Sequence, residues 1–396
     1  MKHSIKAQLS VELKSIVKGY PKFVYSNDRN QKVDGIPVFV YHTIDSSVFE
    51  QHLTYLQEND YRTLTIHEFY DIITKKQSVN SSDKLVLLTI DDARSSVWLY
   101  AYPLLKKYKM HATVFVIPGL TEVNNILREN LEHFWNGKIT SDSLRDIDPH
   151  DDLLCSWSEI KEMYQSGFVD IESHTLFHKE VFVNNKIVDF VTAKTPNTPY
   201  NFAGSAYLTK ENLNTRFNIS DFFGLPIFES APLMLAGPKI NFTQEFTNRC
   251  KEIYQKKIKH DDSLWKNEII SLIRRRETST RYFSLQNDSM NDVMEDLSLA
   301  RDIIQGKLDK SAGNHLCLPW TIGNEKTVEI CKKLGVKSCF WGILDKKRIN
   351  KPGDDPFYIT RIKNDFLFRL PGKGRKSLLS IYTDKLKRRL SGDKIF

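Results

Sequence analysis

Two aspartates, Asp91 and Asp92, stand side by side at the end of an apolar run in the stretch "KLVLLTIDDARSS" (84–96). Adjacent carboxylates repel each other unless water, a positive side chain or a metal ion compensates their charge. The residues before them are Leu, Val, Ile and Thr without polar alternation, which predicts a buried strand of a parallel sheet. Because α/β proteins place their sites at the C-terminal ends of such strands, the pair is a candidate for catalysis or metal binding.

Three further Asp-Asp pairs lie in polar, turn-rich text, at 151–152, 261–262 and 354–355. Aspartate favours turns and helix N-caps, so we interpret these three pairs as solvated loop or cap residues. The pair at 91–92 is therefore the one that needs a chemical explanation.

A second candidate is the pair of histidines in "SHTLFH", His174 and His178, which also follows an apolar run. Imidazoles four residues apart on a helical turn share a face and can bind one metal ion. A carboxylate as third ligand suits zinc or another divalent ion, and three protein ligands leave a position open for water. The alternative is a chance pair of surface histidines near a helix start. The Asp pair at the end of a neighbouring strand argues against this alternative.

Apolar spacing along the chain predicts strands that alternate with helices, which is typical of a parallel α/β sheet or barrel. The expected strands include 84–90, 112–118 and 169–174, and the expected helices include 47–61, 97–108, 157–168 and 324–335. The rhythm breaks after 181 and resumes at about 294. We predict an N-terminal helix and linker (1–35), a barrel (36–180 and 294–362), an insertion (181–293) and a basic C-terminal segment (363–396).

Composition and charge limit the class of protein. The net charge is +8 and the basic residues concentrate at the C-terminus. No apolar run approaches the roughly 18 residues of a membrane span, and the first twenty residues lack the apolar core of a signal peptide. Five scattered cysteines form no CxxC pattern, which indicates free thiols in a reducing compartment. We expect a cytoplasmic protein, with the inner face of the membrane as a site of contact.

The segments around the Asp pair and the His pair resemble a known family. The stretch "LLTIDDARSSVWLYAYPLLKKYKMHATVFVIPG" looks like the first motif of the polysaccharide deacetylases (NodB homology, carbohydrate esterase family 4), and "WSEIKEMYQSGFVDIESHTLFH" looks like their second. The stretch "GIPVFVYHTI" and the helix after it are similar to the subgroup that deacetylates poly-N-acetylglucosamine exopolysaccharides. The resemblance covers about 36–180 and 294–345, roughly half of the chain.

The resemblance implies a deformed (β/α) barrel and a metal-dependent N- or O-deacetylase. Carried over by residue, Asp91 would be the general base, while Asp92, His174 and His178 would hold one divalent ion, zinc first and cobalt or nickel as alternatives. Thr175 would be a hydrogen-bonding group within the second motif. The chemistry is consistent, because a bound metal can lower the pKa of water from 15.7 to about 7 and a neighbouring carboxylate can take its proton.

The general acid of the reaction is expected on a different strand. In many family members a histidine near the C-terminus protonates the leaving amine, but the last histidine here is His315. The exopolysaccharide subgroup resembles a permuted arrangement with the acid on the first strand, where this chain has His42 in "VFVYHTI". The alternative for His42 is a core or capping histidine.

The third family motif, R-x-P-x-G, is altered in "HLCLPWTIGN", which has Cys317 in place of the arginine. Pro319 and Trp320 match the motif. Arg94 and Arg361 are candidates for the missing guanidinium, although each also fits a surface residue. Two further side chains have open assignments: Trp320 either stacks on a sugar or packs, and His315 either assists the site or is structural.

Two regions outside the motifs have open roles. The apolar segment "FFGLPIFESAPLML" (222–235) of the insertion forms either a lid or wall of the cleft or a small core of its own. The C-terminal "FLFRLPGKGRKSLLSIYTDKLKRRL" combines Leu and Ile with Lys and Arg at helical spacing. It suits an anionic membrane surface or a lipid-linked substrate, or else it is a solvated basic helix.

Three functions compete. The first is hydrolysis of an acetyl group from an N-acetylated sugar in a surface polysaccharide or lipid-linked glycan. The second is a non-catalytic carbohydrate-binding protein that kept the fold; the altered third motif favours it and the intact Asp-Asp and HxxxH sequences oppose it. The third, nucleic-acid binding, is disfavoured because the basic charge lies mostly outside the expected cleft.

Overall fold

The structure is a computed structural model of the 396-residue chain. It describes residues 19–28, 31–80, 82–123, 125–213, 215–258, 262–275, 281–345 and 347–391. The predicted N-terminal helix falls almost entirely outside these residues.

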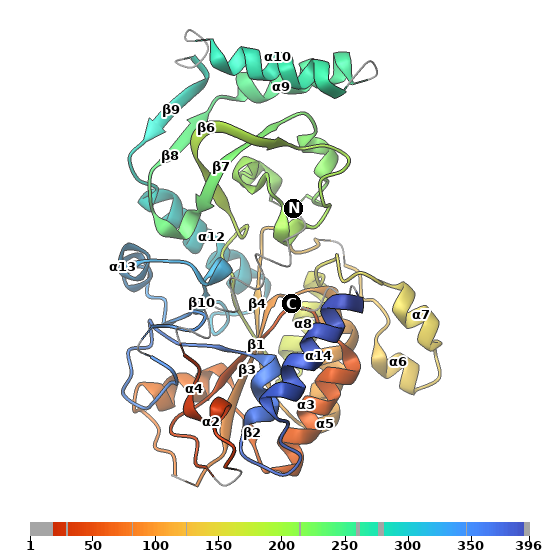
Figure 1. The fold of residues 1–396 in the computed structure, drawn as a ribbon, viewed down its shortest axis with the longest axis vertical. Helices are drawn as coiled ribbons and strands as arrows, with labels where there is room; N and C mark the ends of the chain where they lie inside the picture. Colours follow the sequence, from red (N-terminus) through yellow and green to blue (C-terminus); the bar gives the residue numbers. More distant parts are fainter. Residues whose placement is uncertain are drawn as a thin grey trace.

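A parallel sheet of eight strands forms the lower part of the molecule (Figure 1). The strand order is β11-β10-β5-β4-β3-β1-β12, and β2 pairs with β3 beside this path. The strands are β1 (Val38–Tyr41), β2 (Arg62–Thr63), β3 (Leu85–Asp92), β4 (Ala112–Val116), β5 (Val169–Ser173), β10 (His315–Cys317), β11 (Ser338–Phe340) and β12 (Ile362–Lys363). All residues of β3 are buried, as the unbroken apolar run predicts.

The two edges of this sheet approach each other through one chain segment. Ile359 forms a parallel bridge with Phe340 of β11, and three residues later Ile362 pairs with Phe39 of β1. Residues 359–363 therefore link both edges of the sheet. This closure confirms the predicted α/β class and the deformed barrel.

Helices connect the parallel strands and cover the outside of the barrel, because parallel neighbours need crossover connections. Capping explains where several of them begin: Ser156 and Glu159 form a capping box at α8, and Thr65 and Glu68 form one at α4. The predicted helix 97–108 starts with a π-helical turn, η1 (Val97–Ala101). The helices are α2 (Lys22–Tyr25), α3 (Ser46–Glu58), α4 (Ile66–Ile73), α5 (Tyr102–Tyr108), α6 (Leu131–Trp135), α7 (Ser141–Asp146), α8 (Trp157–Gln165), α12 (Met290–Lys307) and α13 (Glu325–Lys333).

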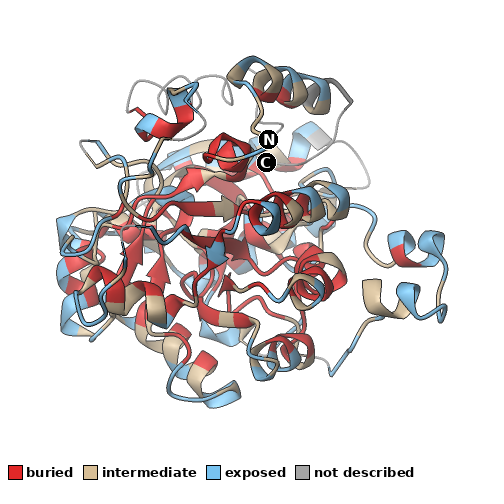
Figure 2. Ribbon diagram, turned by 90° about the horizontal axis from the view of Figure 1, so that it is seen from below, coloured by how far each residue is buried: buried red, intermediate tan, exposed pale blue. Residues whose placement is uncertain are grey.

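The core inside the barrel is apolar at its lower end. Leu87, Phe115 and Phe340 point from the strands toward Ile66 and Phe69 of α4, and all are buried. Figure 2 shows the strands of the barrel as buried elements with exposed helix faces around them. The polar side chains at the C-terminal strand ends therefore lie over a packed interior.

The insertion forms a separate layer above the barrel (Figure 1). It contains two antiparallel pairs, β6 with β7 and β8 with β9, which the sequence did not predict, and two long helices. Phe182, Phe228, Phe246 and Trp265 pack into an aromatic core, which continues into barrel residues such as Ile117 and Phe177. The elements are β6 (Glu180–Phe190), β7 (Pro226–Pro232), β8 (Lys239–Phe242), α9 (Gln244–Lys257), α10 (Asp262–Arg274) and β9 (Phe283–Gln286).

The apolar segment 222–235 serves two cores. Ile227 and Phe228 belong to the aromatic core of the insertion, whereas Leu233 and Met234 pack with Val328 of α13. The Thr327 hydroxyl donates a hydrogen bond to the Met234 carbonyl. Short helical turns are η2 (Pro199–Asn201), η3 (Ser205–Tyr207), η4 (Lys210–Asn212), η5 (Ile219–Phe222), η6 (Leu233–Leu235), η7 (Pro319–Thr321) and η8 (Asn364–Arg369).

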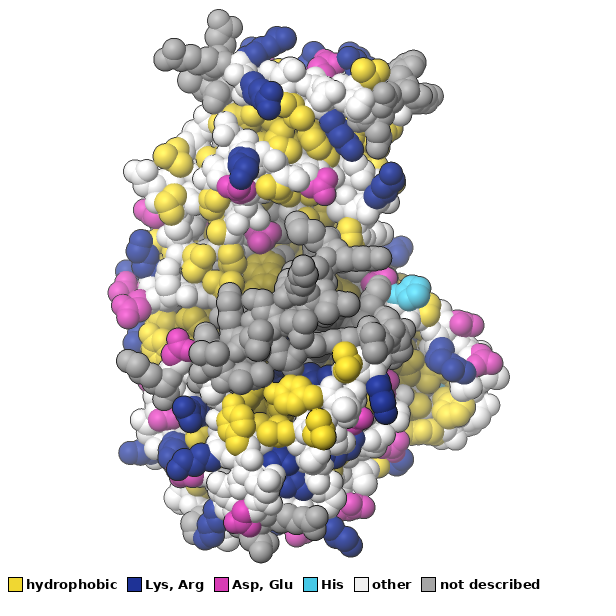
Figure 3. Space-filling view, viewed as in Figure 1, with side chains coloured by type: hydrophobic (Ala, Val, Ile, Leu, Met, Phe, Trp, Pro, Cys, Tyr) yellow, Lys and Arg dark blue, Asp and Glu magenta, His cyan; other side chains and the backbone are white. Residues whose placement is uncertain are grey.

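The basic C-terminal segment contains a helix, α14 (Leu378–Ser391), that packs on η8. Its inner face holds buried Ile381, and Lys385 and Arg388 form ion pairs with Asp365. Apolar side chains gather in Figure 3 over the part of the molecule where Figure 1 draws α14. Within the described parts of the chain, no helix has the length and apolar character that a membrane crossing requires.

Candidate active site

Asp91 and Asp92 are the last two residues of β3, in the middle of the sheet. Asp92 pairs with Val116 of β4, and Val116 pairs with Ser173 of β5, so that His174 follows at the same edge. The backbone turns immediately after the strand, because Asp92 and Ala93 have positive φ values of 71° and 54°. Both carboxylates are buried at the C-terminal end of the barrel.

Asp91 forms a bidentate ion pair with Arg361. The guanidinium Nη1 donates to Oδ1 at 2.6 Å and Nη2 donates to Oδ2 at 2.9 Å, and both side chains are buried. Burial by itself raises the pKa of Asp91, but the charge of Arg361 and the nearby His174 and His42 outweigh it and hold the pKa well below the usual range. Asp91 is therefore an ionised carboxylate inside the barrel.

Asp92 has a guanidinium partner of its own, Arg94. Nε and Nη2 of Arg94 donate to Oδ2 of Asp92 at 3.0 and 2.8 Å, and Nη1 donates to the Thr43 hydroxyl at 2.8 Å. Burial raises the pKa of Asp92, but the charge of Arg94 lowers it further, so the net shift is downward. The second oxygen, Oδ1, lies 3.6 Å from Nε2 of His174.

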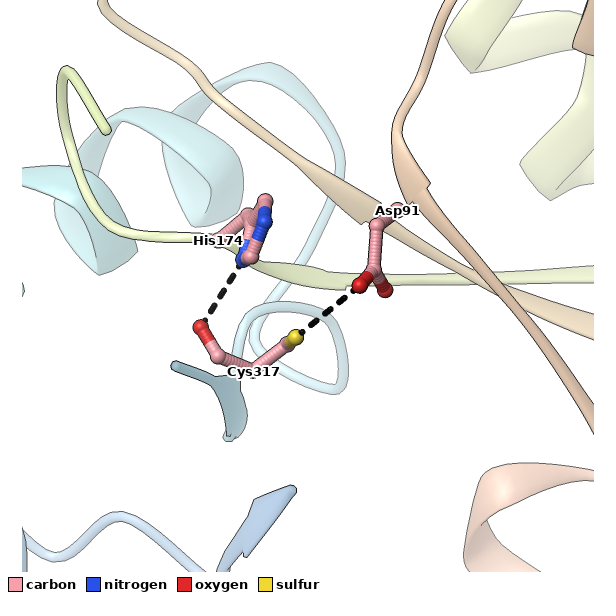
Figure 4. Close-up of side chains that lie close together, drawn as sticks. All are labelled: Asp91, His174 and Cys317. Carbon is pink, nitrogen blue, oxygen red and sulfur yellow. Dashed lines mark hydrogen bonds between the residues drawn. The ribbon is translucent and has the colours of Figure 1, made fainter. Parts of the chain in front are cut away.

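His174 is oriented by the backbone of β10. Its Nδ1 lies 2.9 Å from the carbonyl oxygen of Cys317 (Figure 4). A carbonyl only accepts, so Nδ1 carries the proton and Nε2 presents a lone pair toward Asp92. This is the arrangement by which proteins orient a metal-binding histidine.

His178 reaches the same place through a loop, not through the predicted helical turn. Residues 174–178 are not helical, and Thr175 and His178 have positive φ values of 68° and 50°. The Thr175 hydroxyl accepts a hydrogen bond from the His178 backbone N–H at 3.1 Å. Two left-handed residues thus curl the loop until the imidazole rings lie 4.8 Å apart, which the spacing alone did not reveal.

The donor atoms of Asp92, His174 and His178 lie within 4.8 Å of one another, and all three residues are buried. Nδ1 of His178 is buried and has no hydrogen-bond partner among the residues that the structure describes. Burial, together with the neighbouring His174, lowers the pKa of His178 to about 3, which keeps the ring neutral as a ligand must be. A carboxylate and two neutral imidazoles fit a divalent transition metal.

Two other predicted residues adjoin this group. His42 lies at the rim, with Nε2 at 3.7 Å from Oδ2 of Asp91 and its side chain 34% exposed. Trp320 lies in η7 after buried Pro319, with φ of 51°, and its ring centroid is 4.2 Å from that of His178. The indole therefore packs against His178 at an interplanar angle of 56°, while 39% of Trp320 remains exposed.

His315 lies at the opposite end of β10 from Cys317. Its Nδ1 is 2.6 Å from the Ser338 hydroxyl, and its backbone N–H donates to Glu172. Its ring also contacts Tyr70 of α4. These contacts are structural and lie in the interior of the barrel, away from the two aspartates.

Sequence reasoning missed two residues beside Arg94. The ring of Tyr200, from the insertion, lies 4.0 Å from the guanidinium carbon, and its hydroxyl donates to the Asp151 carbonyl. Asp151 is buried and accepts hydrogen bonds from the backbone N–H and the hydroxyl of Ser96, which corrects its interpretation as a solvated loop residue. Burial raises the pKa of Asp151 to about 6. Neither contact has a local sequence signal, because both join distant segments.

The chain is similar in sequence to a known family and to several proteins. Residues 78–214 match the family described as polysaccharide deacetylase. The chain is 32% identical over 161 residues to the putative polysaccharide deacetylase YxkH of Bacillus subtilis, which covers 39% of this chain and 47% of that protein. It is 27% identical over 205 residues to a poly-beta-1,6-N-acetyl-D-glucosamine N-deacetylase of Staphylococcus aureus, which covers 52% of this chain and 62% of that protein.

A solved de-N-acetylase structure from Aggregatibacter actinomycetemcomitans aligns with 88% of this chain and 99% of its own, with a TM-score of 0.50 and 18% identity. At this identity the likeness concerns the fold. The matched region spans about half to three fifths of the length of the curated relatives.

Proposed function

We propose, from the premise that this chain belongs to the polysaccharide deacetylase family, that it hydrolyses the acetyl group of an N-acetylated sugar in a surface polysaccharide or lipid-linked glycan. The observation that carries the proposal is the buried group of Asp92, His174 and His178 directly beside the ionised Asp91. Such a group places a metal ligand set and a proton acceptor together at the C-terminal end of the barrel, which hydrolysis of an amide requires.

Asp92, His174 and His178 would hold one divalent ion, and we propose zinc, with cobalt or nickel as functional replacements. When bound, the ion would supply acidified water and polarise the acyl carbonyl. Arg94 keeps Oδ2 of Asp92 occupied, so that Oδ1 is the oxygen that faces His174. The Cys317 carbonyl keeps Nε2 of His174 unprotonated on the same side.

Asp91 acts as the general base in this proposal. Arg361 fixes both of its oxygens and keeps the carboxylate ionised, so it is ready to accept a proton from the attacking water. A carboxylate of low pKa is a weak base. A bound metal ion would lower the pKa of the attacking water and so bring it closer to the pKa of Asp91.

His42 is the proposed general acid for the leaving amine. Its imidazole lies 3.7 Å from Oδ2 of Asp91 and is partly exposed, where a substrate amide can reach it. Burial lowers the pKa of His42, while the carboxylates of Asp91 and Asp92 oppose that shift. The exposed part of Trp320 offers an apolar face at the same rim, and we propose that it contacts a sugar ring.

The competing function is a carbohydrate-binding protein without catalysis, which the altered third motif favours. Acetate release separates the two. Protein stripped with EDTA and then reloaded with zinc, cobalt or nickel is incubated with N-acetylglucosamine oligomers and with lipid-linked N-acetyl sugars. We expect metal-dependent acetate release from at least one of them and none from an Asp91→Asn variant. Sugar binding without acetate release from a metal-loaded protein would support the competing function.

We also propose that the protein works in the cytoplasm at the inner face of the membrane. The supporting observation is the outer face of α14, where Leu379 and Leu386, seven residues apart, are 75% and 56% exposed. Residues 363–396 hold ten Lys and Arg against three Asp, which accounts for most of the net charge of +8. Exposed leucines beside basic side chains suit a bilayer with anionic lipid.

A further inference from the structure

A thiol lies beside the proposed base. The Cys317 Sγ is 3.5 Å from Oδ2 of Asp91, and the Cys317 carbonyl accepts the hydrogen bond from His174 (Figure 4). The donor atoms of Asp91, His174 and Cys317 lie within 4.8 Å of one another, and all three side chains are buried. These residues form a second group of potential ligands that shares His174 with the first.

The two groups differ in the cations that they favour. Asp92, His174 and His178 offer oxygen and nitrogen, whereas the second group adds sulfur, a soft ligand that selects thiophilic ions. Carboxylate, imidazole and thiolate together suit a tetrahedral cation, and the sulfur favours cadmium, which is softer than zinc. We propose that Asp91, His174 and Cys317 form a second cation site that takes divalent ions softer than zinc, such as cadmium, and that an ion bound there inhibits the enzyme.

The two sites exclude each other because of His174. Its Nδ1 is bonded to the Cys317 carbonyl, so only Nε2 has a lone pair to give, and one lone pair serves one cation. An ion in the second site therefore removes a ligand from the first. On binding, the Cys317 thiol loses its proton to solvent and the sulfur takes the coordination bond.

Inhibition has a second cause in the same geometry, and this part rests on the proposed function. A cation in the second site coordinates Asp91, and the coordinated oxygen cannot also accept a proton from water. The ion also competes with Arg361 for the carboxylate. Cadmium, which is softer than zinc, is thus expected to bind tightly in the second site and to support no turnover.

The test compares cadmium binding in three proteins stripped of metal: the wild type, Cys317→Ala and His178→Ala. Sulfur-to-cadmium charge transfer in the near ultraviolet reports thiolate coordination without reference to activity. We expect the wild type and His178→Ala to show this absorption at one equivalent, and Cys317→Ala to lose it. Cobalt binding should show the reverse pattern, with a loss in His178→Ala and retention in Cys317→Ala.

The other four cysteines are also buried free thiols, so Cys250→Ala serves as a matched control that keeps the cadmium signal. Cys317→Ser repeats the test if the alanine variant does not fold. In activity assays, the wild type and Cys317→Ala are each compared with their own cobalt-loaded rate, and we expect cadmium to inhibit the wild type at least about tenfold more strongly than Cys317→Ala.

Equal cadmium absorption in the wild type and Cys317→Ala would overturn the second site. Cadmium binding through Cys317 that leaves cobalt-supported turnover intact would overturn the inhibition while leaving the cation site in place. If no protein releases acetate with any metal, the proposed function fails, but the absorption experiment still decides the second site.

Discussion

Arg361 and Asp91 form a bidentate ion pair across the seam of the barrel. Arg361 lies in the segment 359–363 that joins the two edges of the sheet, and Asp91 is the penultimate residue of the interior strand β3. The position at which the related motif has an arginine is occupied by Cys317, whose thiol approaches the same carboxylate at 3.5 Å. The guanidinium thus reaches the proposed base from the closing segment, not from β10.

Replacement of Arg361 by Met should leave Asp91 as an unpaired buried carboxylate. Loss of one partner of a buried ion pair costs about 3–5 kcal/mol of unfolding free energy. In the native protein the pKa of Asp91 is lowered, so the pair stabilises above the unfolded pKa, and this stability is lost as the pH falls. In Arg361→Met burial raises that pKa, so the destabilisation should be larger at about pH 8 than at about pH 5.

Urea unfolding at the two pH values measures this difference. Arg361→Lys keeps the charge but not the bidentate geometry, so its unfolding free energy should lie between those of the wild type and Arg361→Met. An equal loss of stability at both pH values would show that the charge of Asp91 is not the cause.

Removal of the metal or of a metal ligand should abolish turnover together with metal binding. We expect EDTA treatment to remove activity. Loss of a residue that only hydrogen-bonds to a metal ligand lowers metal affinity by about 10- to 100-fold. His178 is itself a proposed ligand, so His178→Ala should lower the affinity for cobalt by more than that. Titration calorimetry of the stripped protein gives the affinity. His315→Gln is the comparison, because His315 contacts Ser338 and Glu172 and should leave cobalt affinity unchanged.

Arg94 should couple to the metal through Asp92. Arg94→Met leaves Asp92 unpaired in the metal-free protein, where we expect a loss of about 3–5 kcal/mol. A bound cation supplies the missing positive charge, so the loss should be smaller in the metal-loaded protein. Both side chains are buried, and charges interact strongly there. Unfolding with EDTA and with zinc measures the two losses.

Tyr200→Phe is a suitable control for that experiment. It keeps the ring over the Arg94 guanidinium and removes only the hydroxyl bond to the Asp151 carbonyl. Its stability should respond to zinc as the wild type does. If Arg94→Met lost the same free energy with and without zinc, Arg94 would be a structural residue that is not coupled to the cation.

The sequence predicted the parts of the site that depend on local pattern. The apolar run before Asp91 and Asp92 indicated the buried strand, and the alternation of strands and helices indicated the barrel, which the structure and the comparisons confirm. The match of residues 78–214 to the polysaccharide deacetylase family was also predicted from the motifs.

The contacts that complete the site could not be predicted from local sequence pattern. Arg361 is far from Asp91 in the sequence, and its role as partner depends on how residues 359–363 close the sheet. Asp151 was interpreted as solvated because its partners, Ser95 and Ser96, follow a different strand and are distant in sequence. The HxxxH spacing was read as helical because backbone dihedral angles at Thr175 and His178 leave no trace in residue type.

His42→Asn should lower kcat by about 10²- to 10⁴-fold if His42 donates the proton to the leaving amine. An acid must carry its proton, so the rate should fall as the pH rises through the pKa of His42. Burial lowers that pKa, so the decline should begin below the ordinary histidine value of about 6.5 in the free enzyme. The pH profile of kcat/KM shows this limb in the wild type, and the variant should lack it.

His67→Asn is the matched control, because His67 is an exposed histidine at the start of α4. Its pH profile should retain the wild-type limb. A His42→Asn profile with an unchanged alkaline limb would reassign the acid to another group.

The outer face of α14 should bind vesicles that contain anionic lipid. Burial of Leu379 and Leu386 contributes about 1.5–3 kcal/mol each, and each basic side chain near the surface adds about 1 kcal/mol. We expect co-sedimentation with anionic vesicles that weakens as salt increases, and little with zwitterionic vesicles.

Leu379→Glu combined with Leu386→Glu should abolish vesicle binding. Leu285→Glu, at a leucine that is 68% exposed on β9, should leave it intact. Because the inner face of α14 is fixed by Ile381 and the ion pairs of Asp365, both glutamates lie on a face that folding does not use. Binding that survives the double substitution would place the membrane contact elsewhere.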